Sequence, residues 1–380
     1  MTAACKGSAS RLPRPLALLA AALLAAAVAR PVPAMDVNRP EVREFIADMS
    51  ARYSYDKRRL RKLLKKAQSQ PAILEAMDRP AERSKAWFEY REIFVNEKRI
   101  GEGVEFWREH RAALERASAR TGVPPEYLVA ILGVETRYGR STGRYRVLDA
   151  LATLAFDYPP RSKFFTEELE QFLLLGREGT VKPLTTLGSY AGAMGAPQFM
   201  PSNYRRYAVD AAANGRIDLW SNWDDVLASI GNYFRQFGWT PGEAVLTEAV
   251  LVTPTPAPVA DPELAPAPAP APAPVADPAA DANPAAAPAL DGHRLELSET
   301  VGSLRSKGLV FESTLPADAP ALAIAADEPD GAHWRVGYRN FYVITRYNHS
   351  ALYGMAVYEL AAAIRERMGL QDAVVGAPIP

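Results

Sequence analysis

Apolar residues recur every three to four positions over most of residues 36–241, which is the spacing of amphipathic helices. After residue 243 the pattern changes to short apolar alternations that are typical of strands. A helical pattern returns near residue 342. The chain is therefore expected to be mainly α, with a small antiparallel sheet. We expect helices at 41–49, 56–67, 102–121, 163–175, 224–237 and 350–368, and strands at 244–252, 295–297, 321–326 and 334–338.

The segment 122–139 combines a predicted helix with a carboxylate on its apolar face. Its two prolines suit a first helical turn, where the backbone N–H groups have no partner within the helix in any case. At 3.6 residues per turn, Glu135 shares one face with three apolar residues that precede it. These residues are Leu128, Ile131 and Leu132.

An acid in this position has two interpretations. Burial among apolar groups is expected to raise the pKa of Glu135, and a carboxyl group that stays protonated near neutral pH suits a general acid acting on a glycosidic bond. Alternatively, Glu135 forms a structural ion pair, because Arg137, Arg140 and Arg144 are close in sequence and ion pairs also shift pKa values. Motifs further along the chain favour the first interpretation.

The first 34 residues are typical of a secretion signal. Three basic residues precede an apolar run at 16–29, which is short for a membrane-spanning helix, and small residues follow it. An N-terminal membrane anchor is the alternative. Cys5 is the only cysteine, and it precedes the apolar run, where it is wrongly placed for lipid attachment. We therefore expect a soluble protein exported to the periplasm, without disulfides.

The composition is that of a globular protein. The chain has 380 residues, of which 48% are hydrophobic and 23% are charged, so it has enough material for a core of one or two domains. Lys and Arg together number 44, as do Asp and Glu, and this balance gives no indication of nucleic-acid binding. A basic run at 57–66 is most simply a solvated helix face.

Residues 253–290 are rich in alanine and proline, and 265–274 alternate the two without a break. Such a segment cannot bury a core and is expected to be an extended, polyproline-type loop. Surface loops tolerate insertions at low cost, which favours an unselected insertion. The alternative is a spacer or a ligand for a partner protein.

Three other segments mix aromatic residues with amides, hydroxyls and arginine: 158–165, 189–204 and 340–353. Aromatic rings stack on sugar rings, and amides orient hydroxyl and acetamido groups. Small residues at 191–196 allow a close backbone approach. Although a tyrosine cluster is more often part of a core, this mixture favours a sugar-binding groove.

Together these motifs resemble those of a known family. The sequences Glu135-Thr-Arg-Tyr-Gly, Gly192-Ala-Met-Gly-Ala-Pro-Gln198-Phe-Met-Pro-Ser and Arg346-Tyr347-Asn348-His-Ser occur in this order in the lytic murein transglycosylases of the membrane-bound lytic transglycosylase B type. The segment 148–159 is also similar. The resemblance covers roughly 40–245 and 290–368.

The resemblance implies a lysozyme-like helical core with an additional helical domain and a small antiparallel β domain. It implies non-hydrolytic cleavage of the MurNAc-β-1,4-GlcNAc bond of peptidoglycan, with a 1,6-anhydro product, in cell-wall turnover. Glu135 would be the single catalytic acid and base. The implied substrate-binding residues are Tyr90, Arg161, Phe164, Ser189, Gln198, Phe199, Tyr233, Tyr347, Asn348 and Tyr353.

The pattern and the resemblance together suggest a division of the chain. The expected parts are a signal peptide at 1–34, an N-terminal helical domain at 35–120, a catalytic core at 121–243, a β domain at 244–338 that is interrupted by the loop, and a C-terminal part of the core at 339–380.

Two positions depart from the family pattern. Pro160 precedes Arg161 where two adjacent arginines are expected, which leaves one guanidinium for the anionic peptide stem. Phe164 stands where a tyrosine is usual, which removes one hydroxyl.

The family can also carry an EF-hand-like calcium loop, and the matching stretch is 210–221. Asp210, Asn214 and Asp218 offer oxygen atoms, but Ala212 replaces the third-position ligand and Ser221 stands where a bidentate acid closes the site. We therefore expect no metal and no required cofactor, with a metal-free Asx-type turn as the preferred interpretation.

Glycan strands of peptidoglycan are the expected partner, and two other functions stay open. A lysozyme-like hydrolase needs a second acid, for which Asp149 and Asp157 are candidates. A non-catalytic peptidoglycan-binding scaffold would use the Ala/Pro-rich loop to bind proteins of cell-wall synthesis or division.

Overall fold

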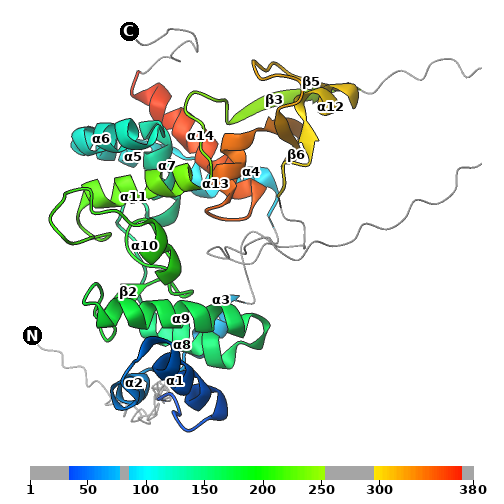
Figure 1. The fold of residues 1–380 in the computed structure, drawn as a ribbon. Helices are drawn as coiled ribbons and strands as arrows, with labels where there is room; N and C mark the ends of the chain where they lie inside the picture. The colour runs from blue at the N-terminus through cyan, green and yellow to red at the C-terminus, as the bar shows by residue number, and fades with distance from the viewer. Residues whose placement is uncertain (1–33, 78–84, 253–294, 370–380) are drawn as a thin grey trace, which may run out of the picture. The chain divides into compact units, whose positions relative to one another are not determined.

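Helices make up most of the structure (Figure 1). The computed structural model describes residues 34–77, 85–252 and 295–369, all of which belong to one compact unit. No helix in these ranges is both long and apolar enough to cross a membrane. The helices are α1 (Pro40–Tyr53), α2 (Lys57–Leu64), α3 (Pro71–Met77), α4 (Trp87–Phe94), α5 (Glu97–Glu109), α6 (Arg111–Thr121), α7 (Pro125–Thr136), α8 (Val147–Asp157), the 3-10 helix η2 (Pro159–Arg161), α9 (Ser162–Arg177), α10 (Pro201–Tyr207), α11 (Trp223–Gln236), α12 (Val301–Ser306), α13 (Arg339–Thr345) and α14 (Ala351–Arg367).

Local sequence signals set several helix ends. The Asp56 side chain accepts a hydrogen bond from the backbone N–H of Arg59 at 2.6 Å and so caps α2. Asn222 caps α11 in the same way. Gly122, with φ 71°, ends α6 in the left-handed conformation that glycine adopts readily.

Two groups of helices share one apolar core. In the first, α8 packs along α9, while α3 contacts α8 and α10 contacts α9. In the second, α14 packs on α4, α5, α7 and α13, and α11 packs on α6. Buried apolar residues run without a break from one group to the other.

A small antiparallel sheet completes the fold (Figure 1). Its five strands lie in the order β4-β6-β7-β3-β5, and α12 packs against β6 over a second, smaller core. A separate two-stranded ribbon joins β1 and β2. The strands are β1 (Tyr145–Arg146), β2 (Leu187–Gly188), β3 (Leu246–Leu251), β4 (Glu299–Thr300), β5 (Leu309–Val310), β6 (Pro320–Glu328) and β7 (Gly331–Gly337).

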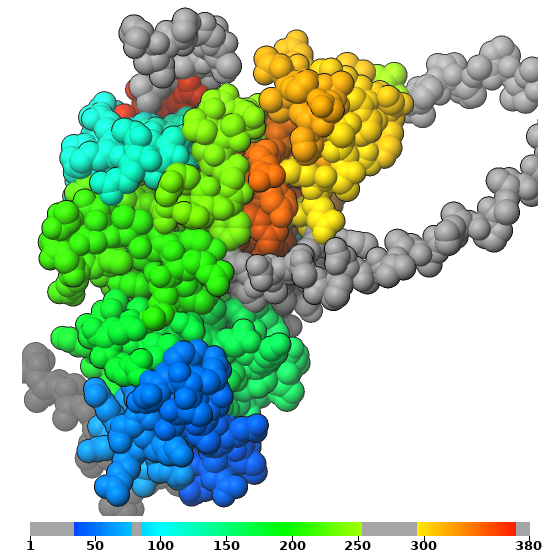
Figure 2. Space-filling model, in the orientation of Figure 1, coloured from blue at the N-terminus to red at the C-terminus, as the bar shows by residue number. Residues whose placement is uncertain are grey.

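The chain returns from the sheet to the helices through a buried amide. Asn340 is fully buried; its side chain accepts from the backbone N–H of Thr240 at 2.8 Å and donates to the carbonyls of Thr240 and Glu243. Figure 2 shows the segments near residues 240 and 340 in contact on this face. These bonds fix the start of α13 beside residues 240–243, and the motif 346–350 follows directly after this helix.

The predicted helices and most predicted strands are present, but two predictions are wrong. The helix expected at 102–121 is interrupted at His110, whose ring packs against Phe106 at 4.5 Å and Trp223 at 5.0 Å. Tertiary packing at this position therefore overrides the helical period. Residues 295–297 form no strand, because Leu295 and Leu297 pack against the main core and pairing begins only at β4.

Candidate active site

The last turn of α7 presents Glu135. Pro125 stands in the first turn of this helix, and the three apolar residues predicted to share a face with Glu135 are fully buried. Glu135 itself is half-buried. Arg137 and Tyr138 adopt positive φ angles of 52° and 61°, which turn the chain sharply after the helix. The predicted helix is confirmed, and the predicted rise in the pKa of Glu135 stays a prediction.

A tyrosine from the other end of the chain binds this carboxylate. The Tyr353 hydroxyl donates a hydrogen bond to Glu135 Oε1 at 2.6 Å. Burial raises the pKa of Tyr353 well above its ordinary value, and the negative charge of Glu135 adds to the effect. Tyr353 is therefore a neutral donor at any physiological pH. Arg137 and Arg140, near Glu135 in sequence, make ion pairs with Glu102.

A cavity of about 180 Å³ opens beside Glu135. Residues from α3, α7, α9, the loop after β2 and the turn before α14 line it. Glu135 is the only carboxylate among the described lining residues. They are Met77, Glu135, Arg161, Phe164, Phe165, Ser189, Tyr190, Ala191, Ala193, Gln198, Met200, Tyr347 and Asn348.

The loop at 189–199 presents two neutral polar groups to this cavity. The Ser189 Oγ accepts from the backbone N–H of Ala193 at 3.0 Å, which leaves its hydroxyl hydrogen available to a ligand. The Gln198 Nε2 donates to the carbonyls of Gly195 at 2.9 Å and Thr142 at 3.2 Å, so its amide oxygen is left to accept. One donor and one acceptor suit a sugar hydroxyl or acetamido group.

Hydrogen bonds shape this loop and fix it to α7. Met194 and Phe199 exchange two backbone hydrogen bonds, and the Thr136 hydroxyl, next to Glu135, donates to the carbonyl of Ala196 at 2.8 Å. Gly195 has φ 70°, and a Cβ there would lie 2.5 Å from the Leu219 carbonyl oxygen. The glycine is required here by both conformation and space.

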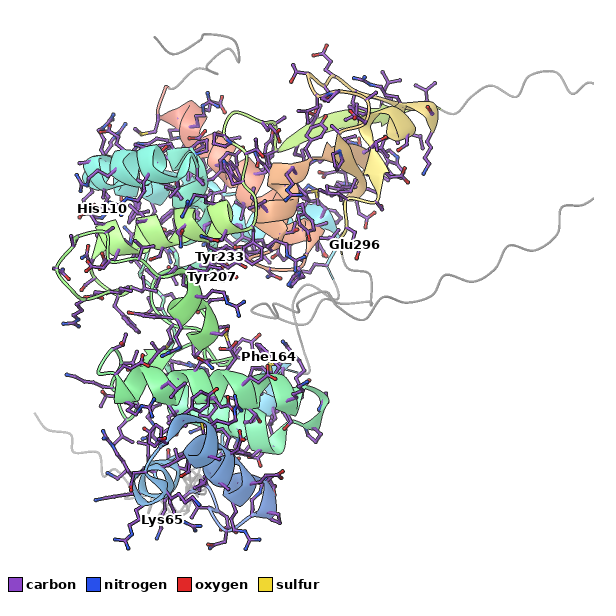
Figure 3. All side chains as sticks on the ribbon, viewed as in Figure 1. Lys65, His110, Phe164, Tyr207, Tyr233 and Glu296 are labelled. Atoms are coloured by element: carbon purple, nitrogen blue, oxygen red, sulfur yellow. The ribbon has the colours of Figure 1, made fainter. Side chains whose placement is uncertain are left out.

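Arginine and phenylalanine form another part of the cavity wall. The Arg161 guanidinium lies over the Phe164 ring at 4.6 Å and the Phe165 ring at 5.2 Å. Burial lowers the pKa of Arg161, but a guanidinium stays charged in proteins. Figure 3 labels Phe164 on α9. The wall therefore offers a cation on an aromatic surface, as suits a carboxylate-bearing sugar.

Four of the predicted substrate-binding residues are buried and do not line the cavity. Tyr233 donates to the Arg346 carbonyl at 2.6 Å and its ring contacts Tyr347 at 4.9 Å; Figure 3 labels it on α11, near Tyr207. Phe199 contacts the Tyr347 ring at 6.0 Å. All four are at most 3% exposed, and none is among the residues that line the cavity: Tyr90, Phe199, Tyr233 and Tyr353.

Sequence reasoning missed part of the lining. Phe165 and Tyr190 directly follow predicted residues, so their positions within the motifs were an available signal. Met77 comes from α3, and nothing in its sequence surroundings indicates the site.

The two carboxylates considered as a second acid have other roles. Asp149 pairs with Arg146 at 2.5 Å and accepts from the backbone N–H of Gln68. Asp157 pairs with Arg39 at 2.5 Å and accepts from the Ser69 hydroxyl. Neither lines the cavity beside Glu135, so neither is placed there as a second acid.

The loop matching an EF-hand is held by hydrogen bonds to Asp225 of α11, which accepts from the backbone N–H groups of Ala211, Ala212 and Asp218, and by bonds within the loop. The Asp210 oxygens accept from the backbone N–H groups of Asn214 at 3.1 Å and Gly215 at 2.7 Å. Asp218 accepts from the Ser221 hydroxyl at 2.6 Å. With Ala212 in place of a ligand, these residues do not fit an EF-hand donor set. No cluster of three or more metal-binding side chains occurs in the part of the chain that the structure describes.

Comparison with known proteins identifies the family. A family model described as the transglycosylase SLT domain matches residues 38–267 and 274–362. The chain belongs to this family. The resemblance predicted from the motifs is thereby confirmed, and the transglycosylase fold accounts for the mainly helical architecture.

Individual relatives agree with this assignment. The transglycosylase is 37% identical over 336 residues to the membrane-bound lytic murein transglycosylase B of Escherichia coli, covering 86% of this chain and 83% of that protein. The solved structure of soluble lytic transglycosylase SltB1 from Pseudomonas aeruginosa matches with a TM-score of 0.72 and 42% identity, over 87% of this chain and all of that one. SltB3 of the same organism, in complex with NAG-anhNAM-pentapeptide, matches with a TM-score of 0.65 and 26% identity, over 85% and 78% of the two chains.

Proposed function

We propose that this transglycosylase cleaves the MurNAc-β-1,4-GlcNAc bond of peptidoglycan without water and forms a 1,6-anhydro-muropeptide. The observation that carries the proposal is the single carboxylate, Glu135, in a cavity whose other described polar groups suit a sugar. The match to a relative whose structure holds NAG-anhNAM-pentapeptide supports the product.

In the proposed first step Glu135 acts as an acid. Its proton passes to the glycosidic oxygen, the bond from that oxygen to C1 of muramic acid breaks, and positive charge develops at C1. The acetamido oxygen of the same sugar stabilises this centre in place of a second carboxylate. Ser189 and Gln198 supply hydrogen bonds that orient the sugar, and Arg161 faces the anionic peptide stem.

In the second step ionised Glu135 acts as a base. It takes the proton of the muramic C6 hydroxyl while that oxygen bonds to C1 and closes the anhydro ring. Glu135 is then protonated again and ready for another cycle. The hydrogen bond from Tyr353 holds the carboxylate in one orientation through both steps.

A hydrolase would instead need a carboxylate placed to activate water. Within the described residues no second acid lines the cavity, and Asp149 and Asp157 are committed to ion pairs. The scaffold alternative would require a non-functional site, whereas Glu135, Ser189 and Gln198 are arranged around one cavity.

The proposed place of action is the periplasm. The basic start and short apolar run of residues 1–34 favour export, and the position of Cys5 argues against a lipid anchor. Residues 1–33 lie outside the described ranges, as does the Ala/Pro-rich segment. A role of that segment in binding cell-wall synthesis or division proteins is a secondary proposal.

The decisive experiment is mass spectrometry of the soluble products from purified sacculi incubated with residues 35–380. We expect muropeptides lighter by one water than those released by lysozyme. Reducing-end muropeptides would instead identify a hydrolase, and binding without release would support a scaffold.

Replacing the catalytic acid tests the role of Glu135. Glu135→Gln is expected to lower turnover by at least about a hundredfold, the scale of general acid–base catalysis. Glu126→Gln, on the same helix and outside the cavity lining, is the matched control and should keep normal turnover. Near-normal product release by Glu135→Gln would refute the assignment.

A further inference from the structure

A second groove lies away from the candidate active site. It has a volume of about 640 Å³ and runs between α2 and the chain that follows α9. Leu63, Val181 and Leu184 contribute apolar surface, and Arg59, Lys62, Lys66 and Lys182 contribute positive charge. The groove therefore combines an apolar interior with a cationic rim.

The sequence of α2 explains this arrangement. Leu60 and Leu64 are fully buried, so the helix is anchored by one face and leaves its basic residues exposed. On the other side, Gly176 packs so closely on Pro183 that a Cβ would lie 2.3 Å from the proline ring. The groove is therefore built from packed elements on both sides.

Most cations of this surface have no acidic partner among the described residues. Within the described chain, seven side chains on α2 and beside it make neither an ion pair nor a hydrogen bond, whereas Arg61 binds Asn38 at 3.2 Å. Glu178, the acid nearest in sequence to the α9 end, pairs with Arg205 at 2.5 Å. The seven are Lys57, Arg58, Arg59, Lys62, Lys65, Lys66 and Lys182.

We propose that this groove binds the carboxylate-bearing peptide stems of peptidoglycan at a site separate from the cavity that contains Glu135. The proposal rests on the proposed function, which makes this polymer the substrate. Stem peptides carry carboxylates for the rim and methyl groups for the apolar interior. A concave site suits such a chain better than a lipid surface, which requires protruding apolar side chains.

The position of the groove supports a polymeric ligand. Helix α9 contributes Phe165 to the catalytic cavity and Gly176 to the groove. At 1.5 Å per residue, these positions are about 16 Å apart along the helix. Figure 3 labels Phe164, which lines the cavity, and Lys65, which is next to the groove residue Lys66 in sequence, at well-separated places. A polymer that repeats its stem can occupy both sites, and the second contact raises its effective local concentration at the first.

Binding of purified sacculi tests the proposal. The parent is Glu135→Gln, so that the polymer is not consumed. The groove variant adds Lys62→Ala, Lys66→Ala and Lys182→Ala. The control instead adds Arg108→Ala, Arg111→Ala and Arg120→Ala, which remove the same charge from exposed positions outside the groove. We expect affinity for sacculi to fall about tenfold in the groove variant, the scale of three exposed ion pairs, and less than about twofold in the control.

Stem-free glycan distinguishes the ligand. After an amidase has removed the stems, parent and groove variant should bind equally. If the groove variant instead bound stem-free glycan about tenfold more weakly than the parent does, the groove would bind carboxylates of the glycan itself. That result would overturn the proposal. The proposal would also be overturned if the groove variant bound sacculi as the parent does but no longer bound phosphatidylglycerol vesicles. The groove would then bind a lipid surface.

Failure of this proposal is separable from failure of the proposed function. With intact Glu135, the groove substitutions should raise KM on sacculi and leave kcat unchanged, because they lie outside the cavity. If the chain released no anhydro product, the binding comparison would still report on the groove. Equal KM and equal binding in both variants would refute the groove and leave the catalytic assignment intact.

Discussion

At the scale of the residue, one hydrogen bond holds the proposed catalytic carboxylate. Tyr353 and Glu135 are 218 positions apart, yet the hydroxyl and Oε1 lie at 2.6 Å. Tyr347 beside it is also buried and donates to the Pro197 carbonyl at 2.8 Å. The neutral Tyr353 donor suits a group that must both lose and regain a proton, because a neutral hydrogen bond favours the charged form of the carboxylate less than an adjacent cation would.

Removing the Tyr353 hydroxyl tests this arrangement. Tyr353→Phe is expected to lower kcat on sacculi about tenfold or more, since hydrogen bonds to charged groups contribute roughly 1.5–3 kcal/mol. Tyr204→Phe is the control, because that buried hydroxyl donates to the Ile217 carbonyl instead. Comparable kcat values for Tyr353→Phe and the unmodified enzyme would contradict the role.

Because Glu168 is buried, we expect the stability of the fold to depend on pH. Burial raises the pKa of Glu168 from 4.5 to about 7, against hydrogen bonds from the Ser202 hydroxyl and backbone N–H. The folded state then holds a proton that the unfolded state has released. This contribution to stability is therefore largest at low pH and falls as pH rises from about 4.5 to about 7, by about 3 kcal/mol in total.

Glu168→Gln should remove this dependence. The amide can still accept from Ser202 and carries no charge to desolvate, so the variant should gain stability relative to the unmodified enzyme as the pH is raised from 5 to 8. Thermal unfolding at both pH values measures the difference. Parallel pH dependences of the two proteins would show that Glu168 does not titrate as proposed.

At the scale of the element, two short loops between helices have conformations fixed by hydrogen bonds. The loop 189–199 reaches the cavity because Gly195 fits against the Leu219 carbonyl and because Thr136 ties Ala196 to α7. The loop 210–221 is held by side chains that accept backbone N–H groups. Both loops are thus held by hydrogen bonds within the loop and by hydrogen bonds to a neighbouring helix.

From the hydrogen bonds of the loop 210–221 we expect that calcium does not change the thermal stability of the protein. Millimolar calcium should leave the melting temperature unchanged, whereas a bound ion at a hundredfold excess over its Kd would stabilise the fold by about 2.7 kcal/mol. Ala212→Asp combined with Ser221→Glu restores the missing ligands and should create a calcium-dependent rise. A rise in the unmodified enzyme would show that the loop binds metal after all.

At the scale of the whole molecule, the sheet is formed by strands from both sides of the Ala/Pro-rich segment. Strand β3 precedes the segment and pairs with β7 and β5, while β4 follows it and pairs with β6. In the sheet order, β3 and β4 are three positions apart, or about 14 Å. A short linker can span that distance.

Replacing residues 256–291 by about ten Gly and Ser residues, which span roughly 17 Å, should therefore preserve the fold. Stability should rise by about 1 kcal/mol, because a shorter loop loses less entropy on closure. Cleavage of sacculi by the purified protein should stay within about twofold, since the described cavity lies elsewhere. Loss of cleavage with a normal melting temperature would instead give the segment a functional role.

The longer helices and the longer strands β3, β6 and β7 were predictable from the sequence, whereas α3, α4, α8, α10, α12 and the two-residue strands were not predicted. The helix carrying Glu135 follows from two prolines and an apolar period, and the sheet follows from alternation with turn signals. The motifs at 135–139, 192–202 and 346–350 then indicated the family, because several chemical groups in one order are more specific than any one of them.

Tertiary structure alone decided which residues reach the cavity. Met77 lines it without any local signal, while Tyr233 and Phe199, predicted to line the groove, are buried and contact the Tyr347 ring. Periodicity reports which face of an element is apolar, but it does not report which neighbour covers that face. The hydrogen bond from Tyr353 to Glu135 and the break at His110 have the same origin, because both depend on contacts between segments far apart in the chain.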